Sequence, residues 1–266
     1  MTAPALILLA DGSTEATANQ VMFALRRRMR QLRPGLSIHL CFAEGGVPDA
    51  TQTAAALIEA GAEEAVFVPL NITHATDPPE SVLRTMKALG ADCAGLRINV
   101  ARPIGPACEL LSILDLRLRS ALAASHTLEL DGLVLSAPDS GDPRGAALLA
   151  RRARQWRAHH KLPVQLAYGH EPGHSVAAAL TALRAQGRRL IAVGSFFLSA
   201  DHRYTEQAAL ALDLGAVAVS PPIGPDERLL DLAMARYSVS ALELLDTDVP
   251  FGGFGLHDDA TVPLPA

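Results

Sequence analysis

The sequence of 266 residues is poor in cysteine, in aromatic residues and in positive charge. The three cysteines (Cys41, Cys93 and Cys108) form no CxxC pair, so we expect free thiols in a reducing compartment and no disulfide framework. The formal net charge of −5 argues against a general binder of nucleic acid or of anionic membranes. The first apolar run stops at Asp11 and has no basic leader, so neither a signal peptide nor a membrane span is expected. We therefore expect a cytoplasmic protein.

Several common catalytic motifs are also missing. The chain has no Walker loop, no GxGxxG and no GxSxG, so we expect no nucleotide cofactor. The string HEPGH at residues 170–174 has the letters of the HExxH zinc-protease motif. That motif requires a helix, which Pro172 and Gly173 oppose, so we interpret the stretch as a loop.

Strand and helix patterns alternate along the chain. Apolar residues recur at steps of three and four in the helical segments, as at Met22, Leu25 and Met29. Short apolar runs predict eight strands, at residues 5–10, 36–42, 64–70, 95–101, 132–137, 163–168, 189–198 and 215–220. The predicted fold is therefore α/β, with parallel sheets built from right-handed βαβ units.

The two halves of the chain resemble each other. "LILLADGST" (6–14), "GAEEAVFVPL" (61–70) and "RPIGP" (102–106) return in the same order as "LVLSAPDSG" (133–141), "GRRLIAVGSF" (187–196) and "PPIGP" (221–225). An ordered set of matches indicates a duplication. We predict two tandem four-stranded domains at residues 1–125 and 126–245, then an irregular extension at 246–266.

Polar side chains follow three successive strands of the first half. Asp11 follows the first strand, Glu44 the second and His74 the third, and these are the positions that converge in a doubly wound sheet. Two carboxylates and an imidazole suit a divalent transition metal. The alternative is that each is an ordinary cap or loop residue. Ser13 or Thr14 is expected to cap the helix after Asp11, where the helix dipole favours an ionised carboxylate.

The equivalent positions in the second half are altered. Pro138 stands at the position of Asp11, and only the histidine after the third strand returns, as His202. The arginine-rich helical segments 26–33 and 151–157 are interpreted as solvated faces that can also attract an acidic substrate. The duplicated fold thus predicts a cleft in which one half supplies most of the site.

These motifs resemble the sirohydrochlorin chelatase family, class II chelatases of the CbiX type. The resemblance rests on "ADGST" after the first strand, "FAEGGVP" with Glu44, "HATD" with His74, and "RPIGP" before a helix, and it spans about residues 4–245. It implies the long, two-domain form. The family includes the cobaltochelatase of anaerobic cobalamin synthesis and the ferrochelatase of siroheme synthesis.

The resemblance implies insertion of a divalent metal (Co²⁺, Fe²⁺ or Ni²⁺) into a tetrapyrrole between the two domains, without ATP. It implies that His74, Glu44 and Asp11 act as metal ligands and catalytic groups, and that Gly12, Ser13 and His202 contact the substrate. Asp11 stands where the family usually has a histidine. Two alternatives stay open: a tetrapyrrole or metal carrier without chelatase activity, and an unrelated α/β hydrolytic or transfer enzyme. Neither a nucleic acid nor a membrane is an expected partner, and a monomer or a homodimer is compatible with the duplication.

Overall fold

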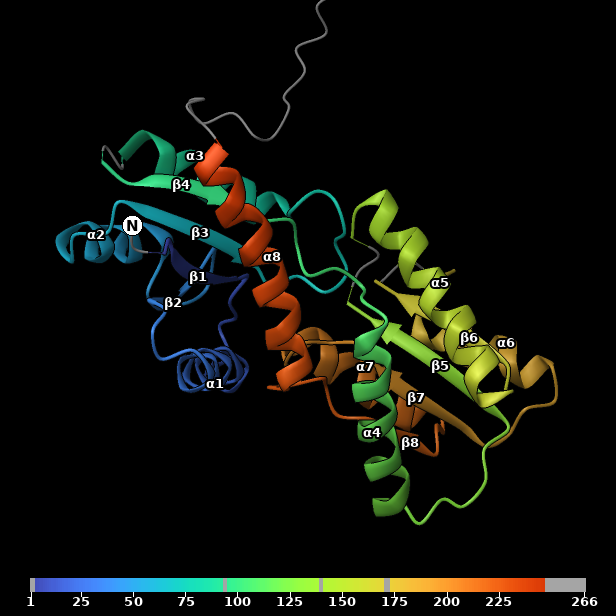
Figure 1. Cartoon of the computed structure of the whole chain (residues 1–266). Helices are drawn as coiled ribbons and strands as arrows, with labels where there is room; N and C mark the ends of the chain where they lie inside the picture. Colours follow the sequence, from blue (N-terminus) through green and yellow to red (C-terminus); the bar gives the residue numbers. More distant parts are fainter. Residues whose placement is uncertain (1–2, 93–94, 139–140, 170–172, 247–266) are drawn as a thin grey trace, which may run out of the picture.

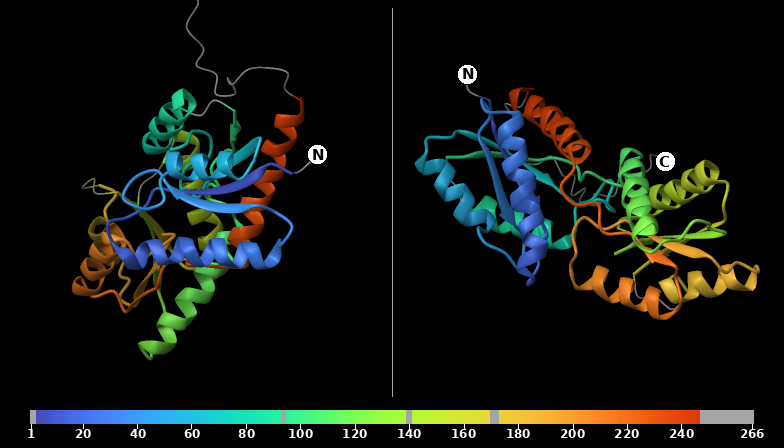
Figure 2. Two further views of the ribbon diagram at one scale, coloured as in Figure 1. Left: turned by 90° about the vertical axis from the view of Figure 1, so that its left-hand side faces the viewer. Right: turned by 90° about the horizontal axis from the view of Figure 1, so that it is seen from below.

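The computed structural model describes residues 3–92, 95–138, 141–169 and 173–246. It contains two four-stranded parallel sheets, each flanked by helices, in separate lobes (Figures 1 and 2). The predicted α/β class and the two tandem parallel sheets are confirmed. The extension beyond residue 246 lies outside the described residues.

The first sheet has the strand order β2-β1-β3-β4 and the second has β6-β5-β7-β8. Each order places the first strand of its half in the centre, so the two halves share one topology. In chain order the first-half elements are β1 (Ala5–Ala10), α1 (Ala16–Leu32), β2 (Ile38–Phe42), α2 (Ala50–Glu59), β3 (Glu64–Pro69), α3 (Glu80–Asp92), β4 (Arg97–Val100) and α4 (Glu109–Ala124). The second-half elements are β5 (Gly132–Ala137), α5 (Pro143–His160), β6 (Val164–Tyr168), α6 (Val176–Ala185), β7 (Ile191–Ser195), α7 (His202–Asp213), β8 (Ala218–Val219) and α8 (Glu227–Asp246).

Alternation along the central strands divides each core into two layers. Leu6 and Leu8 of β1 face one side, where the apolar faces of α1 and α8 cover them. Ile7 and Leu9 face the other side and pack with α2 and α3. This two-sided burial explains why β1 is apolar at every position, as parallel strands covered by helices usually are.

The last helix of each half packs on the sheet of the other half. Helix α4 lies against β7 and β8 of the second sheet, whereas α8 lies against β3 and β4 of the first (Figure 1). One buried apolar cluster therefore runs through both lobes, with Leu114 of α4 beside Gly194 of β7 and Leu230 of α8 in the same cluster. The exchanged helices join the lobes through the core. Within the described residues, no helix is both long and apolar enough to span a bilayer.

Candidate functional site

The carboxyl ends of β1 and β2 are tied together at the edge of the first sheet. The backbone N–H of Ala43 donates to the carbonyl of Ala10 at 2.8 Å, and that of Glu44 donates to the carbonyl of Asp11 at 3.1 Å. Gly12 has φ +77°, and a Cβ there would lie 1.8 Å from the carbonyl oxygen of Glu44. Only glycine therefore fits between Asp11 and the β2 turn.

The Asp11 carboxylate is half-buried and held by two neighbours. Asn71, which follows β3, donates from Nδ2 to Oδ2 at 2.7 Å, and Ser81 in the first turn of α3 donates from Oγ to Oδ1 at 3.0 Å. The two bonds fix the orientation of the carboxylate, while each oxygen keeps a further lone pair for a ligand. Asn71 and Ser81 were not predicted, because sequence patterns do not show which loop reaches Asp11.

The start of α1 differs from the prediction that Ser13 or Thr14 caps it. The residue before the helix is Glu15, whose side chain makes no capping bond. The Ser13 hydroxyl instead accepts from the backbone N–H of Glu15 at 3.1 Å. Asn19 reaches back to bond both the N–H and the carbonyl of Ser13, at 3.0 and 2.7 Å. The cap prediction is wrong because Asn19 holds this turn.

Glu44 is exposed at the same edge and paired with an arginine. Arg84 of α3 donates to Glu44 Oε1 at 2.8 Å, and both side chains are more than half exposed. An exposed pair of this kind contributes little to stability, roughly 0–1 kcal/mol. Arg84 can therefore exchange Glu44 for another carboxylate at low cost.

His74 lies in the loop after β3, where the first lobe meets the second. Its ring is half-buried, and Nδ1 lies 3.4 Å from the hydroxyl of Thr73. Asp142, the N-cap of α5, accepts with Oδ2 from the backbone N–H groups of Ala75, Thr76 and Asp77 at 3.0, 2.5 and 2.8 Å. The second lobe thus holds the backbone immediately after His74.

Asp142 is buried and ionised at this contact. Burial opposes its charge, but backbone donors from Gly145, Thr76, Asp77 and Ala75 outweigh that effect and hold its pKa below the usual range. The neighbouring Gly145 is equally constrained, since a Cβ there would lie 2.1 Å from the carbonyl oxygen of Thr73. The sequence pair Asp142-Pro143 has the form of an N-cap followed by a first-turn proline, so the cap itself was detectable.

The predicted ligands share an edge but do not converge in the structure. Within the described ranges, Asp115, His159 and His160 are the one group of three His, Cys, Asp or Glu residues whose ligand atoms all lie within 4.8 Å of one another. Asp11, Glu44 and His74 form no such group. Their action on one metal ion stays a prediction, and it requires Glu44 to leave Arg84.

The remaining predicted contacts lie at the carboxyl edges of both sheets. His202 is exposed in the first turn of α7, whose N-cap Asp201 accepts from the N–H of Tyr204 at 2.9 Å.

In the stretch 170–174, residues 170–172 lie outside the described residues, so the loop interpretation stays untested. His174 is described, and its ring stacks on Tyr168 with centroids 4.7 Å apart.

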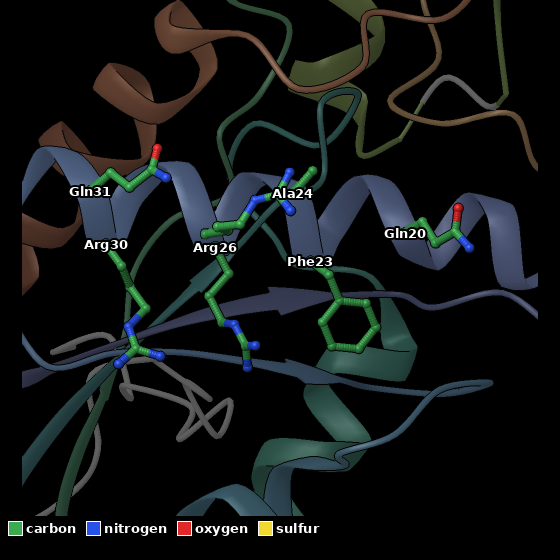
Figure 3. A pocket seen from close by; sticks show the side chains of 7 residues that line it. Gln20, Phe23, Ala24, Arg26, Arg30 and Gln31 are labelled. Atoms are coloured by element: carbon green, nitrogen blue, oxygen red, sulfur yellow. The ribbon is translucent and has the colours of Figure 1, made fainter.

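An arginine-rich hollow lies on the outer face of α1. Its volume is about 800 Å³, and Phe23, Arg26 and Arg30 point into it (Figure 3). The guanidinium of Arg26 lies 5.5 Å from the centroid of the Phe23 ring. A second hollow of about 410 Å³ runs between α1 and the start of α8, where Arg28 pairs with Glu227. Of the arginines in segment 26–33, Arg26 and Arg30 line the first hollow, Arg28 lines the second and Arg27 lines both.

A comparison with known protein families gives a match for the first half of the chain. The CbiX family model matches residues 5–121, which span the elements from β1 through most of α4. This part of the chain is therefore similar to the CbiX family. No curated protein matches the sequence significantly.

The two halves together resemble solved chelatase structures. SirB, the sirohydrochlorin chelatase of Bacillus subtilis subspecies spizizenii, in a complex with cobalt, is 17% identical with a TM-score of 0.71, over 91% of this chain and 96% of that one. SirB of Bacillus subtilis with Fe³⁺ is 17% identical with a TM-score of 0.73, over 91% and 97%. DR2241 of Deinococcus radiodurans, a multi-domain protein with structural similarity to chelatases, is 15% identical with a TM-score of 0.59, over 90% of this chain and 55% of that one. At these identities the likeness establishes the tandem chelatase fold.

Proposed function

We propose that this chain inserts a divalent metal, Co²⁺ or Fe²⁺, into a sirohydrochlorin-type tetrapyrrole without a nucleotide. The observation that carries the proposal is the position of His74. Its imidazole follows β3 of the domain that matches the CbiX family, and the loop that bears it is held from the other lobe by Asp142. A planar substrate at this junction would meet groups from both sheets.

The donor set suits the chemistry of metallation. Insertion of one divalent ion releases two pyrrole protons, so the site must hold the incoming metal and accept protons near neutral pH. Imidazole binds cobalt and ferrous iron, which assigns the incoming metal to His74. Once the ion has passed to the tetrapyrrole, the freed ring nitrogen of His74 can accept one of the two pyrrole protons. Asp11, held by Asn71 and Ser81, is assigned as an oriented anionic ligand. Glu44 is assigned as a second proton acceptor with access to water.

The acidic side chains of the substrate give Arg84 a role. Arg84 lies on α3, the helix that also supplies Ser81. It forms an exposed pair with Glu44, which lies beside Asp11. A substrate carboxylate bound to Arg84 would release the Glu44 carboxylate for the metal or for a pyrrole proton. Substrate binding would thereby complete the ligand set. Gly12, Ser13 and His202 are proposed as further substrate contacts at the two carboxyl edges.

A carrier of a tetrapyrrole or of a metal is the second candidate function. It is favoured by the engagement of both carboxylates, since Asp11 accepts from two side chains and Glu44 is paired with Arg84. In a carrier these bonds would persist in the loaded protein, and no proton acceptor beside His74 would be required.

One experiment separates the two functions. Metal-free protein is mixed with sirohydrochlorin and Co²⁺ or Fe²⁺ under anaerobic conditions, and the absorption spectrum is followed against a protein-free control. An enzyme accelerates the spectral change of metallation in proportion to its concentration, with turnover above one. A spectral shift of the metal-free tetrapyrrole without faster metallation would instead establish the carrier.

A further inference from the structure

A compact group of metal-binding side chains lies away from the carboxyl edges. It consists of Asp115 on α4 and of His159 and His160 in the last turn of α5, with the three ligand atoms within 4.8 Å of one another. Helix α5 leaves the carboxyl end of β5 and stops just before β6 begins at Val164. Its last turn therefore lies at the edge where the strands begin, opposite to the edge that bears His74.

The carboxylate of Asp115 is the centre of the group. The indole N–H of Trp156 donates to Oδ1 at 2.6 Å, and Nε2 of His160 lies 2.7 Å from the same oxygen. The other oxygen, Oδ2, is 3.6 Å from Nε2 of His159. The Asp115 side chain is only 13% exposed and that of His159 is 62% exposed. An ion from solvent would thus reach the group past His159 and meet an oriented carboxylate.

Consecutive helical residues normally point in different directions. Here the chain leaves the helix at once, because Lys161 adopts the left-handed conformation with φ 56°. The rings of His159 and His160 lie edge to face with their centroids 4.9 Å apart. Both imidazoles nevertheless reach one carboxylate, that of Asp115.

We propose that Asp115, His159 and His160 form a second divalent-metal site, suited to Zn²⁺, Co²⁺ or Ni²⁺. Two imidazoles and one carboxylate form a ligand set that such ions use, with a position left for water. The separations of 2.7 and 3.6 Å between nitrogen and oxygen lie on either side of the distance between neighbouring ligands of a tetrahedral ion, roughly 3.3 Å from bond lengths near 2.0–2.1 Å. The negative end of the α5 dipole favours a cation, and Arg157 in the same turn opposes it.

A metal at this site would join the two halves of the chain. Asp115 belongs to α4, which comes from the first half and packs on the second sheet, whereas both histidines belong to the second half. The bound ion would link the exchanged helix to α5 in addition to the bond from Trp156. Because an ion bound by the folded state alone stabilises that state, binding should raise the melting temperature.

The test uses the full chain, stripped of metal with a chelator and titrated with Co²⁺ while its visible absorption is recorded. All proteins carry His74→Ala, so that the carboxyl edge lacks its imidazole. Adding His159→Ala should weaken Co²⁺ binding at least tenfold and abolish the rise in melting temperature with Zn²⁺. His159→Gln provides a second variant of similar size. The matched control is His126→Asn, because His126 is exposed on the same lobe and asparagine tolerates its positive φ of 54°.

Unchanged Co²⁺ affinity in both His159 variants would overturn the proposal and leave the group as a hydrogen-bonded contact between helices. An equal loss in the His126 control would also overturn it, because the ion would then be bound by surface histidines in general. The result does not depend on chelatase activity, so this proposal and the proposed function fail separately.

Discussion

The carboxyl edges of the two sheets carry different polar groups on the same topology. Asp11 of the first half is replaced by Pro138 at the equivalent position of the second half. Glu15 precedes α1 and its side chain makes no capping bond. Its equivalent, Asp142, accepts from four backbone N–H groups. The first edge therefore presents side chains that a ligand can reach. The second edge uses its carboxylate to hold the His74 loop. Duplication has given one edge that bears the proposed chemistry and one that supports it.

The largest expected effects come from replacing one histidine at the carboxyl edge of each sheet. We expect His74→Ala to lower the metallation rate about 10²- to 10⁴-fold, because the metal ligand and a proton acceptor are lost together. His202→Ala should raise KM for the tetrapyrrole several-fold and leave metal affinity unchanged. Initial rates at varied metal and substrate concentrations measure both effects. Equal losses in the two variants would contradict the division between the edges.

The second prediction concerns the supporting role of Asp142. Asp142→Ala leaves several backbone donors without their charged acceptor, so we expect the free energy of unfolding to fall by about 3 kcal/mol. Asp49→Ala is the matched control, since Asp49 caps α2 through a capping box with Gln52 of the same helix. It should cost only about 1 kcal/mol. Urea unfolding measures both, and similar costs would reduce Asp142 to an ordinary cap.

The lowered pKa of Asp142 gives the same prediction a pH dependence. Because the pKa is lower in the folded state than in the unfolded state, its contribution to stability is complete above the unfolded value of about 3.9. The contribution is lost as the pH falls from that value through the lowered folded pKa. The difference in unfolding free energy between the native protein and Asp142→Ala should therefore be constant from pH 5 to pH 8 and shrink below pH 4.

The third prediction tests how closely the two lobes approach beside His74. In Gly145→Ala the new Cβ would meet the carbonyl oxygen of Thr73, so we expect a loss of roughly 1–3 kcal/mol and a lower metallation rate. Gly35→Ala is the control, because a Cβ at Gly35 meets nothing within 4 Å. Alanine normally favours a helix over glycine, so a stabilised Gly145→Ala would show that the contact between the lobes is loose.

The sequence alone predicted the strands of both sheets. It did not predict which helices pack on each sheet or which residues bond to the strand-end side chains. Apolar runs located every strand. The central strand β1 is buried at every position and is apolar throughout, as expected for a strand covered on both faces. The edge strands β4 and β6 are only partly buried and include polar residues. The amphipathic patterns of α4 and α8 show that each helix buries one face, but not that the face meets the sheet of the other half. The strand-end residues Asp11, Glu44 and His74 were visible as candidates, whereas the bonds from Asn71, Ser81, Arg84 and Asp142 depend on loops distant in sequence. The group of Asp115 with His159 and His160 was missed for the same reason.

The smallest expected effect concerns Asp11, the residue that departs from the usual family histidine. The carboxylate is oriented by Asn71 and Ser81, and His74 and Glu44 remain as proposed ligands without it, so Asp11→Ala should weaken metal binding about tenfold or more while leaving the fold intact. Asp11→His should raise the affinity for cobalt and nickel, because imidazole is the softer donor. One imidazole cannot accept from both Asn71 and Ser81, so the gain should be only a few-fold. Titration of each metal into both variants, followed by metallation rates, measures these changes. If Asp11→Ala binds and inserts metal as well as the native protein, then Asp11 only ties β1 to α3, and the first edge relies on His74 and Glu44.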